Sequence, residues 1–504
     1  MRATRHNSLF AVAAALIITT PLFGQSVAVT KTNPTKVYMH YMPWFQTPSS
    51  QGGTGGSNWG YHWKMNTQNP NVVDATGKRQ IASHYYPMIG PYDSTDPNVL
   101  EYHMLLMKYS GIDGVMIDWY GQQGSNGDVG SLLTASNAIA DKTGQFGLGV
   151  GVVLEDRFAQ SVSQEQTNMV YLKDHYFNRS NYIKYGPSNS PLMYNFGPIT
   201  FQTPSQWSQI LPSTGTDPEF LTLPYQSNEA GTNADGEFAW PYQDPNTSDH
   251  LSVLRSFYTT QASSLKNSGK IAAGVAYPGF NDFYAQGGAG NTLFYVPENG
   301  GQTLTDTLNL YNTYSSNLSM LQLATFNDFG EGTQFEPTVE DGFRSLNQIQ
   351  QFTGVSYGTA ELQFIYELYL ARKKYAGKTA IQTQLDQVSN DLDSLDVTGA
   401  EALFSTVAPA GDYDGNGVVD ANDYAVWRAN FGKQTIIHGS GSDGNYDGTI
   451  DMADYIIWRD SMTSSAAGAL AGSSVPEPSM AALAAVAAIF FCTGGSRRTR
   501  VSSR

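Results

Sequence analysis

The chain has 504 residues, of which 40% are hydrophobic and 12% are aromatic. Only 14% are charged, and 44 acidic against 28 basic residues give a net charge of −16. This composition excludes a binder of the nucleic-acid backbone, which needs clustered lysine and arginine, and a disordered chain, which is poor in hydrophobic residues. We therefore expect no nucleic-acid partner, and the length suits either about three domains or one large barrel followed by smaller modules.

The N-terminus predicts a secretory signal peptide over residues 1–28. Arg2 and Arg5 precede an apolar run at 9–18 that is too short to cross a bilayer, and a cleavage-like Ser26-Val27-Ala28 follows. The only cysteine, Cys492, lies near the other end, so the exported body has no disulfide, thiolate metal site or cysteine nucleophile. Such a body must be stabilised by a sizeable core, by bound metal, or by both.

Residues 31–377 predict a (β/α)8 catalytic barrel. Short apolar or β-branched runs recur at 36–40, 114–118, 147–155, 191–195, 271–276 and 321–326. A helix is predicted to begin at Asp96-Pro97, a capping residue before a proline in the first turn, and to stop at Gly111. Strands that alternate with helices indicate parallel βαβ units, and continuously apolar strands favour a barrel over an open sheet.

Acidic, amide and aromatic residues follow these predicted strands. In a barrel the strand ends converge on one mouth, where carboxylates supply acid and base, amides bind hydroxyl groups, and flat rings cover the C–H faces of a sugar. A single aspartate there is more often a turn or helix cap, but six such ends together predict a sugar site. The side chains expected to contact substrate are Tyr41, Trp44, Asp118, Trp119, Glu155, Asp156, Asn195, Tyr277 and Asn327.

Two aromatic stretches outside any periodic element extend this set. Trp59, His62 and Trp63 lie in the first, and Trp240 lies in the second. We interpret them as loops that stack on substrate, and packing of a barrel lid is the competing interpretation.

Two longer segments carry a family resemblance. The first runs from Ile81-Ala-Ser-His84-Tyr-Tyr86-Pro87 to Asp118-Trp119-Tyr120, and the second reads Asn327-Asp328-Phe-Gly-Glu331-Gly-Thr-Gln334-Phe-Glu336. Together they resemble glycoside hydrolase family 99, the endo-α-mannosidase and endo-α-mannanase family, within a broader family 71/99-like grouping. The resemblance covers about residues 36–345 and adds Tyr86 and Glu336 to the expected substrate contacts.

The resemblance implies a pair of catalytic carboxylates. In family 99 the last motif reads Asn-Glu-Trp-His-Glu-Gly-Thr-Gln, and its two catalytic glutamates fall on Asp328 and Glu331. Family 71 α-1,3-glucanases carry Asn-Asp-Tyr-Gly-Glu, which is similar to residues 327–331. Glu331 is thus the expected general acid/base and Asp328 the second carboxylate. Asp328 could act on the sugar's 2-hydroxyl with retention or on water with inversion, and no catalytic cofactor is expected.

The function expected from these features is hydrolysis of an α-linked polysaccharide or oligosaccharide, as in an endo-α-mannanase. The alternatives are a family 71-like α-1,3-glucanase and a non-catalytic carbohydrate-binding surface protein.

A repeated acidic loop follows a helix or linker at 378–410. The two copies place oxygen ligands at positions 1, 3, 5, 9 and 12, a glycine at 6 and a carbonyl at 7, which is the spacing of a calcium loop. The same helical text, Tyr-x-x-Trp-Arg, follows each copy. The expected ligands of two structural Ca²⁺ ions are Asp412, Asp414, Asn416, Val418, Asp420 and Asp423, and Asp443, Asn445, Asp447, Thr449, Asp451 and Asp454. Residues 411–463 resemble a type I dockerin, a small all-α module, and the resemblance implies a cohesin-bearing scaffold partner.

The C-terminus reads as a sorting tail over residues 475–504. Val475-Pro-Glu-Pro-Ser479 precedes a short apolar run and then four arginines, an order that resembles the PEP-CTERM signal. The resemblance implies processing by export machinery at the membrane, and a permanent anchor is the alternative. We therefore expect an exported protein, secreted or attached to the cell surface after both ends are removed.

Overall fold

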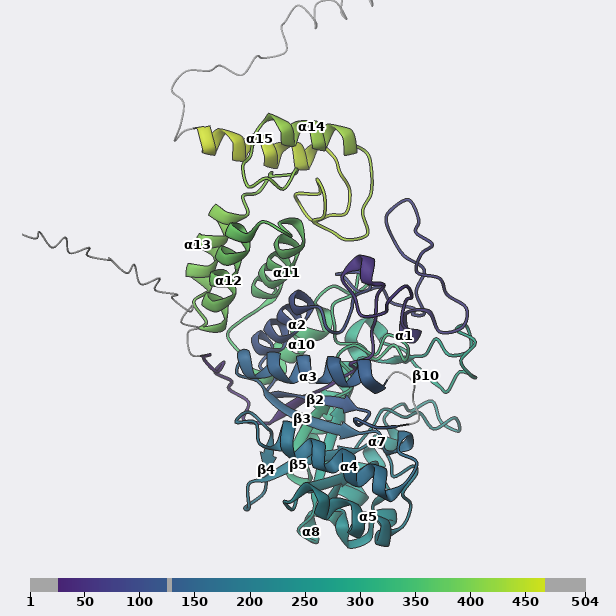
Figure 1. Cartoon of the computed structure of the whole chain (residues 1–504). Coiled ribbons are helices and arrows are strands. Elements are labelled where there is room, and N and C mark those ends of the chain that lie inside the picture. Colours follow the sequence, from purple (N-terminus) through teal and green to yellow (C-terminus); the bar gives the residue numbers. More distant parts are fainter. Residues whose placement is uncertain (1–25, 125–128, 467–504) are drawn as a thin grey trace, which may run out of the picture.

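The computed structural model describes residues 26–124 and 129–466 (Figure 1). Nearly all of the expected signal peptide and the whole expected sorting tail lie outside the described residues. Within the described ranges, no helix combines the length and the apolar character needed to cross a membrane.

Eight parallel strands close into a barrel. Their order is β3-β2-β1-β11-β8-β7-β6-β5, and pairing of β3 with β5 completes the ring. The strands are β1 (Val37–Tyr41), β2 (Gly114–Trp119), β3 (Gly149–Leu154), β5 (Ser190–Asn195), β6 (Glu219–Thr222), β7 (Gly236–Phe238), β8 (Ile271–Ala276) and β11 (Met320–Leu323). The predicted (β/α)8 barrel is confirmed, and the open sheet is excluded.

Three further short strands decorate the barrel. β4 (Lys184–Tyr185) pairs antiparallel with β5, while β9 (Phe280–Asn281) and β10 (Tyr295–Val296) form a separate hairpin in the loop after β8.

Every barrel strand contributes to one interior hydrophobic cluster. Its members on the strands are Tyr38, Met116, Val153, Leu192, Tyr194, Leu221, Phe238, Ile271, Ala273 and Met320. Side chains alternate across a strand, so the residues between these positions point to the surrounding helices. The alternation decides which strand-end residues can face the mouth.

Two barrel strands were not predicted, because β6 and β7 are short and include glutamates and a glycine. The backbones of β7 and β8 approach so closely at Gly236 that an added Cβ would lie 2.0 Å from the Ile271 carbonyl oxygen. Only glycine allows these two strands to pair here.

Helices cover the outside of the barrel. The predicted helix after Asp96 is confirmed as α2 (Pro97–Tyr109), and the Asp96 side chain accepts a hydrogen bond from the Asn98 N–H. The other helices up to residue 353 are α1 (Tyr61–Lys64), α3 (Val129–Gln145), α4 (Val162–Leu172), α5 (Pro204–Ile210), α6 (Ser227–Ala230), α7 (Ser252–Ser256), α8 (Ala262–Asn267), α9 (Gln302–Tyr314) and α10 (Arg344–Thr353). Short 3-10 or π turns occupy 49–51, 156–158, 173–177, 211–214, 231–233, 257–261, 299–301 and 315–317.

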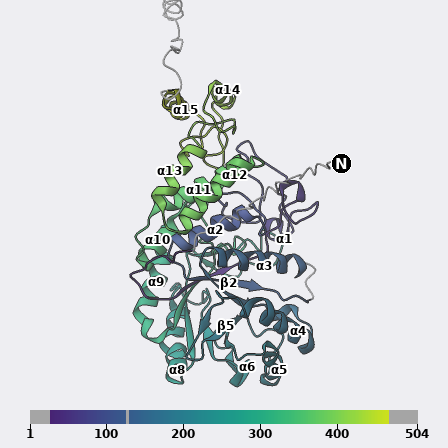
Figure 2. The same ribbon diagram turned by 60° about the vertical axis from the view of Figure 1, so that its left-hand side comes forward.

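Three helices follow the barrel. They are α11 (Thr359–Lys374), α12 (Thr379–Asp393) and α13 (Val397–Val407), and both views place them between the barrel and the C-terminal module (Figures 1 and 2). α11 and the end of α12 contact α2, and α13 packs against α12 and α11. The Tyr109 hydroxyl donates to the Leu392 carbonyl at 2.9 Å, and Lys108 forms an ion pair with Asp393. The segment expected as a helical linker is thus a pair of helices fixed to the barrel.

The C-terminal module consists of two acidic loops with α14 (Ala421–Asn430) and α15 (Met452–Ala466). Its small core contains Tyr413, Trp427 and Ile450. The Trp427 and Trp458 indoles cross between the repeats, since each donates to a carbonyl in the other loop at 2.8 Å, at Asp451 and Asp420 respectively.

A buried ion pair joins α11 to α2. Arg372 donates from Nε and Nη2 to the two carboxylate oxygens of Glu101 at 2.9 and 2.8 Å, and both side chains are under 10% exposed. Two parallel bonds to a buried carboxylate tie the orientation of α11 to that of the barrel.

We expect Arg372→Met to lower the free energy of unfolding by about 3–5 kcal/mol, because it leaves the Glu101 carboxylate buried without its partner. Thermal and denaturant unfolding followed by circular dichroism measure the effect. Arg255→Met is the control, since its pair with Asp249 is largely exposed and should change stability by less than about 1 kcal/mol. Similar small losses for the two variants would contradict the structural role.

Candidate active site

Four carboxylates gather where the barrel strands end. Asp118 is the second-last residue of β2, and Glu155 directly follows β3. Asp328 and Glu331 lie on the loop after β11. Asp118, Asp328 and Glu155 are 2%, 3% and 8% exposed, whereas Glu331 is partly exposed. Asp118 raises the pKa of each of the other three, so all four share one electrostatic environment.

Arg157 partly neutralises this cluster. Its Nε forms an ion pair with the Glu155 Oε2 at 2.7 Å. Burial and then the Asp118 charge raise the pKa of Glu155 well above its usual value, and Arg157 opposes both effects. One guanidinium therefore faces several carboxylates, which favours protonation of some of them near neutral pH.

Asp328 and Glu331 are held in a fixed relation by the loop that carries them. The Glu331 N–H donates to the Asp328 Oδ1 at 2.9 Å, and the Asp328 N–H donates to the Thr325 hydroxyl at 2.9 Å. Burial, followed by the Glu331 charge, raises the pKa of Asp328 well above its usual range. The catalytic pair predicted from the motif thus lies in one desolvated site.

Glu331 has the pKa of a general acid. Burial raises the pKa of its carboxyl to about 7, and the Tyr284 hydroxyl, which donates to Oε1 at 3.0 Å, limits that rise. A carboxyl with a pKa near neutrality carries a proton in a large fraction of molecules at pH 7, which suits proton donation to a leaving oxygen.

Hydrogen bonds to two neighbouring segments, one at His40–Met42 and one at Asn281, hold the loop with Asp328 and Glu331. The Phe326 N–H donates to the His40 carbonyl at 2.7 Å, and the Asn281 N–H donates to the Glu331 carbonyl at 2.8 Å. The Asn327 side chain accepts from the Met42 N–H at 2.8 Å and donates to the Met42 carbonyl at 3.0 Å. Asn327, an expected substrate contact, therefore positions the loop and has its hydrogen bonds satisfied by protein.

Aromatic rings lie beside the carboxylates. The His40 ring contacts Trp240 edge to face with centroids 4.9 Å apart, and Phe196 also contacts Trp240 edge to face at 4.9 Å. Nε2 of His40 lies 3.8 Å from the Asp118 Oδ1, which ties these rings to the carboxylate cluster. Trp240 is partly buried, as befits a ring at the edge of the mouth.

Trp44 and His62 form a second aromatic element near the mouth. Their rings stack in parallel with centroids 3.9 Å apart, and burial lowers the pKa of His62 to about 3, so its imidazole is neutral. The Trp44 indole N–H has no hydrogen-bond partner in the described part of the chain. The flat Trp44 ring fits an expected sugar contact, while its indole N–H is buried from solvent.

Five expected substrate contacts lie away from the mouth. Trp119 points outward next to Asp118, packing beside Tyr171 and Tyr176, because neighbouring residues of a strand face opposite sides. Trp59, Trp63, Tyr86 and Asp156 are buried with partners from their own or nearby loops. Trp59 donates to the Asn71 side chain, and Trp63 donates to the Tyr92 carbonyl. The Tyr86 hydroxyl accepts from the Arg79 N–H. Asp156 accepts from the N–H groups of residues 199–201. The competing packing interpretation thus holds for Trp59 and Trp63.

Tyr41 and Glu336 belong to a buried network behind the site. The Tyr41 hydroxyl lies 2.7 Å from the His103 Nδ1, and Oε1 of Glu336 lies 3.4 Å from the other ring nitrogen. The Tyr92 hydroxyl donates to Oε2 of Glu336 at 2.6 Å and accepts from the Asn327 Nδ2 at 3.1 Å. The expected sugar contacts at Tyr41 and Glu336 are therefore corrected to support of the catalytic loop through Asn327.

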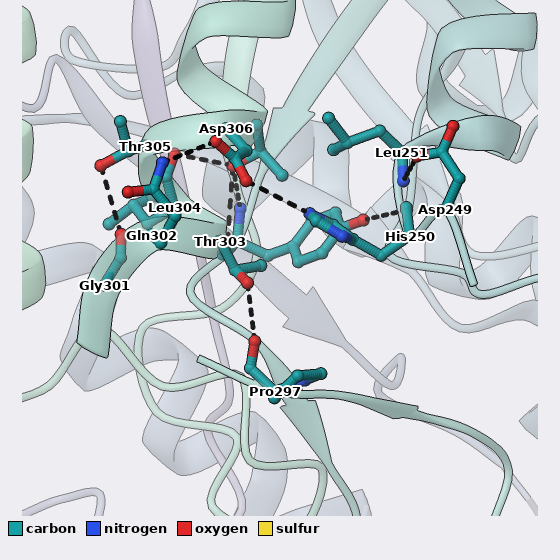
Figure 3. A network of polar contacts seen from close by, with 12 residues as sticks. Asp249, His250, Leu251, Pro297, Gly301, Gln302, Thr303, Leu304, Thr305 and Asp306 are labelled. Carbon is teal, nitrogen blue, oxygen red and sulfur yellow. Dashed lines mark hydrogen bonds and ion pairs between the residues drawn. The ribbon is translucent and has the colours of Figure 1, made fainter. Parts of the chain in front are cut away.

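Tyr277 and Asn195 also differ from the expectation. Tyr277 is buried, and its hydroxyl lies 3.4 Å from the His250 carbonyl, within the polar network that joins His250 to Asp306 on α9 (Figure 3). Asn195 is fully buried and its amide has no hydrogen-bond partner among the described residues. Alternation with Tyr194, a member of the interior cluster, places the Asn195 side chain on the outer side of β5.

Two functional residues were not predicted. Arg157 directly follows Glu155 and Asp156 in the sequence, and this position beside two acids is the signal that could have found it. Tyr284 lies in a loop with no periodic pattern, and only the fold brings its hydroxyl to Glu331.

Comparison with known proteins relates the barrel to glycoside hydrolases. A family model described as glycosyl hydrolase family 99 matches residues 33–226. The glycoprotein endo-α-1,2-mannosidase of Xenopus laevis is 26% identical over 193 residues, which cover 36% of this chain and 41% of that relative. A glycoprotein endo-α-1,2-mannosidase-like protein of Mus musculus is 23% identical over 336 residues, covering 60% and 69%.

A solved structure shares the fold. The family 99 endo-α-mannosidase from Bacteroides thetaiotaomicron superposes with a TM-score of 0.50 at 18% identity, covering 66% of this chain and 98% of that chain. With the carboxylate cluster, these matches define the barrel as a glycoside hydrolase domain. The domain is similar to endo-α-mannosidases, and the family 99 model covers its first half.

We expect Glu331→Gln to stabilise the protein selectively at high pH. The pKa of Glu331 is raised from its usual value of 4.5 to about 7, so the folded state binds this proton more tightly than the unfolded state does. The associated stability is present below pH 4.5 and lost as pH rises through about 7, a loss of at most about 3 kcal/mol. Melting temperatures of wild type and variant should therefore agree more closely at pH 5 than at pH 8, where the variant should melt higher.

Asp174→Asn, at an exposed site on the outer layer, should show no such difference. A variant that melts lower than wild type at pH 8 would contradict the burial of this charge.

Proposed function

We propose that this chain is an exported glycoside hydrolase that cleaves α-mannosidic linkages within polysaccharides or oligosaccharides. The observation that carries the proposal is the Asp328/Glu331 pair, in which Glu331 has a pKa of about 7 beside a second desolvated carboxylate. The relatives that match over the barrel are named for endo-α-mannosidase activity, which supports the choice of linkage.

Each carboxylate has a distinct role in the proposed reaction. Protonated Glu331 donates its proton to the glycosidic oxygen as the bond from that oxygen to the anomeric carbon breaks. On the route through the 2-hydroxyl, the Glu331 carboxylate then takes a proton from the water that opens the sugar intermediate. Asp328 acts on the sugar side, either by deprotonating the 2-hydroxyl that attacks the anomeric carbon or by deprotonating the attacking water. Both routes end with water added across the cleaved bond.

The surrounding groups bind and orient the sugar. Asp118, Glu155 and Arg157 offer acceptors and a donor to hydroxyl groups, and Trp240 and the Trp44/His62 stack supply flat faces for C–H surfaces. Charged and aromatic groups around a desolvated acid are the usual composition of such a pocket.

Hydrolysis of α-1,3-glucan is the second candidate. It is favoured by one observation, the presence of aspartate rather than glutamate at position 328. Incubation of the purified protein with α-mannan and with α-1,3-glucan, followed by product analysis, distinguishes the two substrates.

We expect Glu331→Gln to reduce turnover of a natural glycan by roughly 10²–10⁴-fold, because it removes the general acid. The loss should be much smaller on a glycosyl fluoride, whose leaving group needs little protonation. Asp328→Asn should be severe on both substrates, since the second carboxylate acts on the sugar whatever group leaves. Steady-state kinetics of both variants on both substrates provide the test, and unchanged turnover by Asp328→Asn would exclude the two-carboxylate mechanism.

We also propose that the C-terminal module binds two structural calcium ions. Carboxylate oxygens of Asp412, Asp414 and Asp423 lie within 4.8 Å of one another, and hard oxygen donors at that spacing fit Ca²⁺. Both loops turn through a left-handed glycine at the sixth position, Gly417 and Gly448, with φ of 92° and 83°. The residues that would hold the ions are the twelve expected from the repeat.

Calcium titration of the EDTA-treated protein should show two ions per chain. Asp423→Asn and Asp454→Asn should each leave one site, because each removes the last carboxylate of one loop, and Asp391→Asn, on α12, should leave both. Isothermal titration calorimetry measures the stoichiometry. Two sites in all three variants, or none in wild type, would contradict the proposal.

Export and docking complete the proposal. They are supported by the signal-like residues 1–28, the sorting-like residues 475–504 and the resemblance of residues 411–463 to a dockerin, whose partner would be a cohesin-bearing protein.

A further inference from the structure

The β9–β10 hairpin is attached directly to the catalytic loop. The Asn281 N–H donates to the Glu331 carbonyl and the Phe283 N–H donates to the Gly330 carbonyl, both at 2.8 Å. A few residues later, Tyr284 donates its hydroxyl to the Glu331 carboxylate. A ligand that extends from Glu331 over this segment therefore meets the hairpin next.

The hairpin presents large side chains to solvent. Leu293 and Tyr295 are 60% and 58% exposed, and Tyr242, from the loop after β7, is 50% exposed. Phe294, between Leu293 and Tyr295, packs into the protein. Its ring stacks on Phe280 with centroids 3.9 Å apart and contacts the Tyr242 ring with centroids 5.6 Å apart. We call Tyr242, Leu293 and Tyr295 the hairpin platform.

Polar groups lie beside the hairpin platform. Asn281 pairs across the hairpin with Tyr295, so their side chains share one face of this two-stranded sheet. Tyr85 lies beside them: its pKa is raised by burial and by the nearby Glu298 and Tyr295, and a hydrogen bond with Asn281 opposes that rise. Exposed rings next to an amide and a hydroxyl offer both stacking surface and hydrogen bonds.

We propose that the hairpin platform binds sugar units of the substrate beyond those held at the carboxylate cluster. This inference rests on the proposed function and deepens it, because it makes the preferred substrate a chain long enough to reach from Glu331 to Tyr295. The occupant is a glycan because the surface is continuous with the catalytic loop and combines flat rings with hydroxyl and amide groups. Figure 1 shows β10 on the same side of the barrel as α1, whose residues include His62.

The test compares long and short substrates. Tyr242→Ala and Tyr295→Ala should each raise KM for α-mannan by roughly 5- to 10-fold, the loss of one ring contact, and leave the hydrolysis of a glycosyl fluoride unchanged. Tyr242→Phe and Tyr295→Phe are the matched controls, because each keeps the ring, and both should stay within about 2-fold of wild type. Thermal melting should be the same for all four variants, because the substituted side chains are exposed.

Binding without turnover separates this inference from the proposed function. Affinity electrophoresis in gels containing α-mannan or α-1,3-glucan should show that Glu331→Gln is retarded and that adding Tyr242→Ala and Tyr295→Ala removes the retardation. Retardation lost with the rings supports the hairpin platform even if wild type hydrolyses neither glycan, a result that would overturn only the proposed function. Equal loss of activity on both substrates, no effect of either alanine, or no retardation of Glu331→Gln would each overturn the hairpin platform.

Discussion

Burial of several carboxylates around one arginine is the constraint on which the rest of this structure depends. Asp118, Glu155 and Asp328 are almost completely removed from water; Arg157 opposes the pKa rise of Glu155, and backbone N–H groups oppose that of Asp328. Each of these charges opposes folding, so the site exists only because the barrel and its helices stabilise the chain elsewhere. The same desolvation raises the pKa of Glu331 to about 7 and gives it the proton that chemistry requires.

Buried carboxylates that repel one another must be held in place, and most of the hydrogen bonds that hold their loop involve backbone groups. The loop carrying Asp328 and Glu331 is hydrogen-bonded to the strand end at His40, to Met42 through Asn327, and to the hairpin at Asn281. Behind it, Tyr92 connects Asn327 to the Glu336 carboxylate, which faces His103 on α2. Residues that the motif alone presents as substrate contacts are in this way part of the frame that aims the two acids.

The sequence predicts what depends on local pattern. The barrel, the helix after Asp96 and the acidic pair follow from apolar runs, a cap and a short motif. Prediction from sequence fails where the position of a side chain depends on which face of a strand it occupies, or on contacts between segments distant in the chain. At Asp118-Trp119 one side chain enters the mouth and the other packs outside, and both residue types suit a sugar site. β6 and β7 are too short to show a pattern, and Tyr284 reaches Glu331 only because the loop folds back.

Hydrogen bonds connect the C-terminal module to α11, to Tyr375 just after it, and to a loop of the barrel domain. The Tyr375 hydroxyl donates to the Asp412 carboxylate at 2.6 Å, the Tyr366 hydroxyl donates to the His438 carbonyl at 2.8 Å, and the Ile436 N–H donates to the Thr76 carbonyl at 2.9 Å. These bonds give the module one defined orientation relative to the barrel in this structure. A surface that binds the module would therefore also determine the direction in which the barrel mouth faces. The part of a substrate that the enzyme can reach would then depend on where the module is bound.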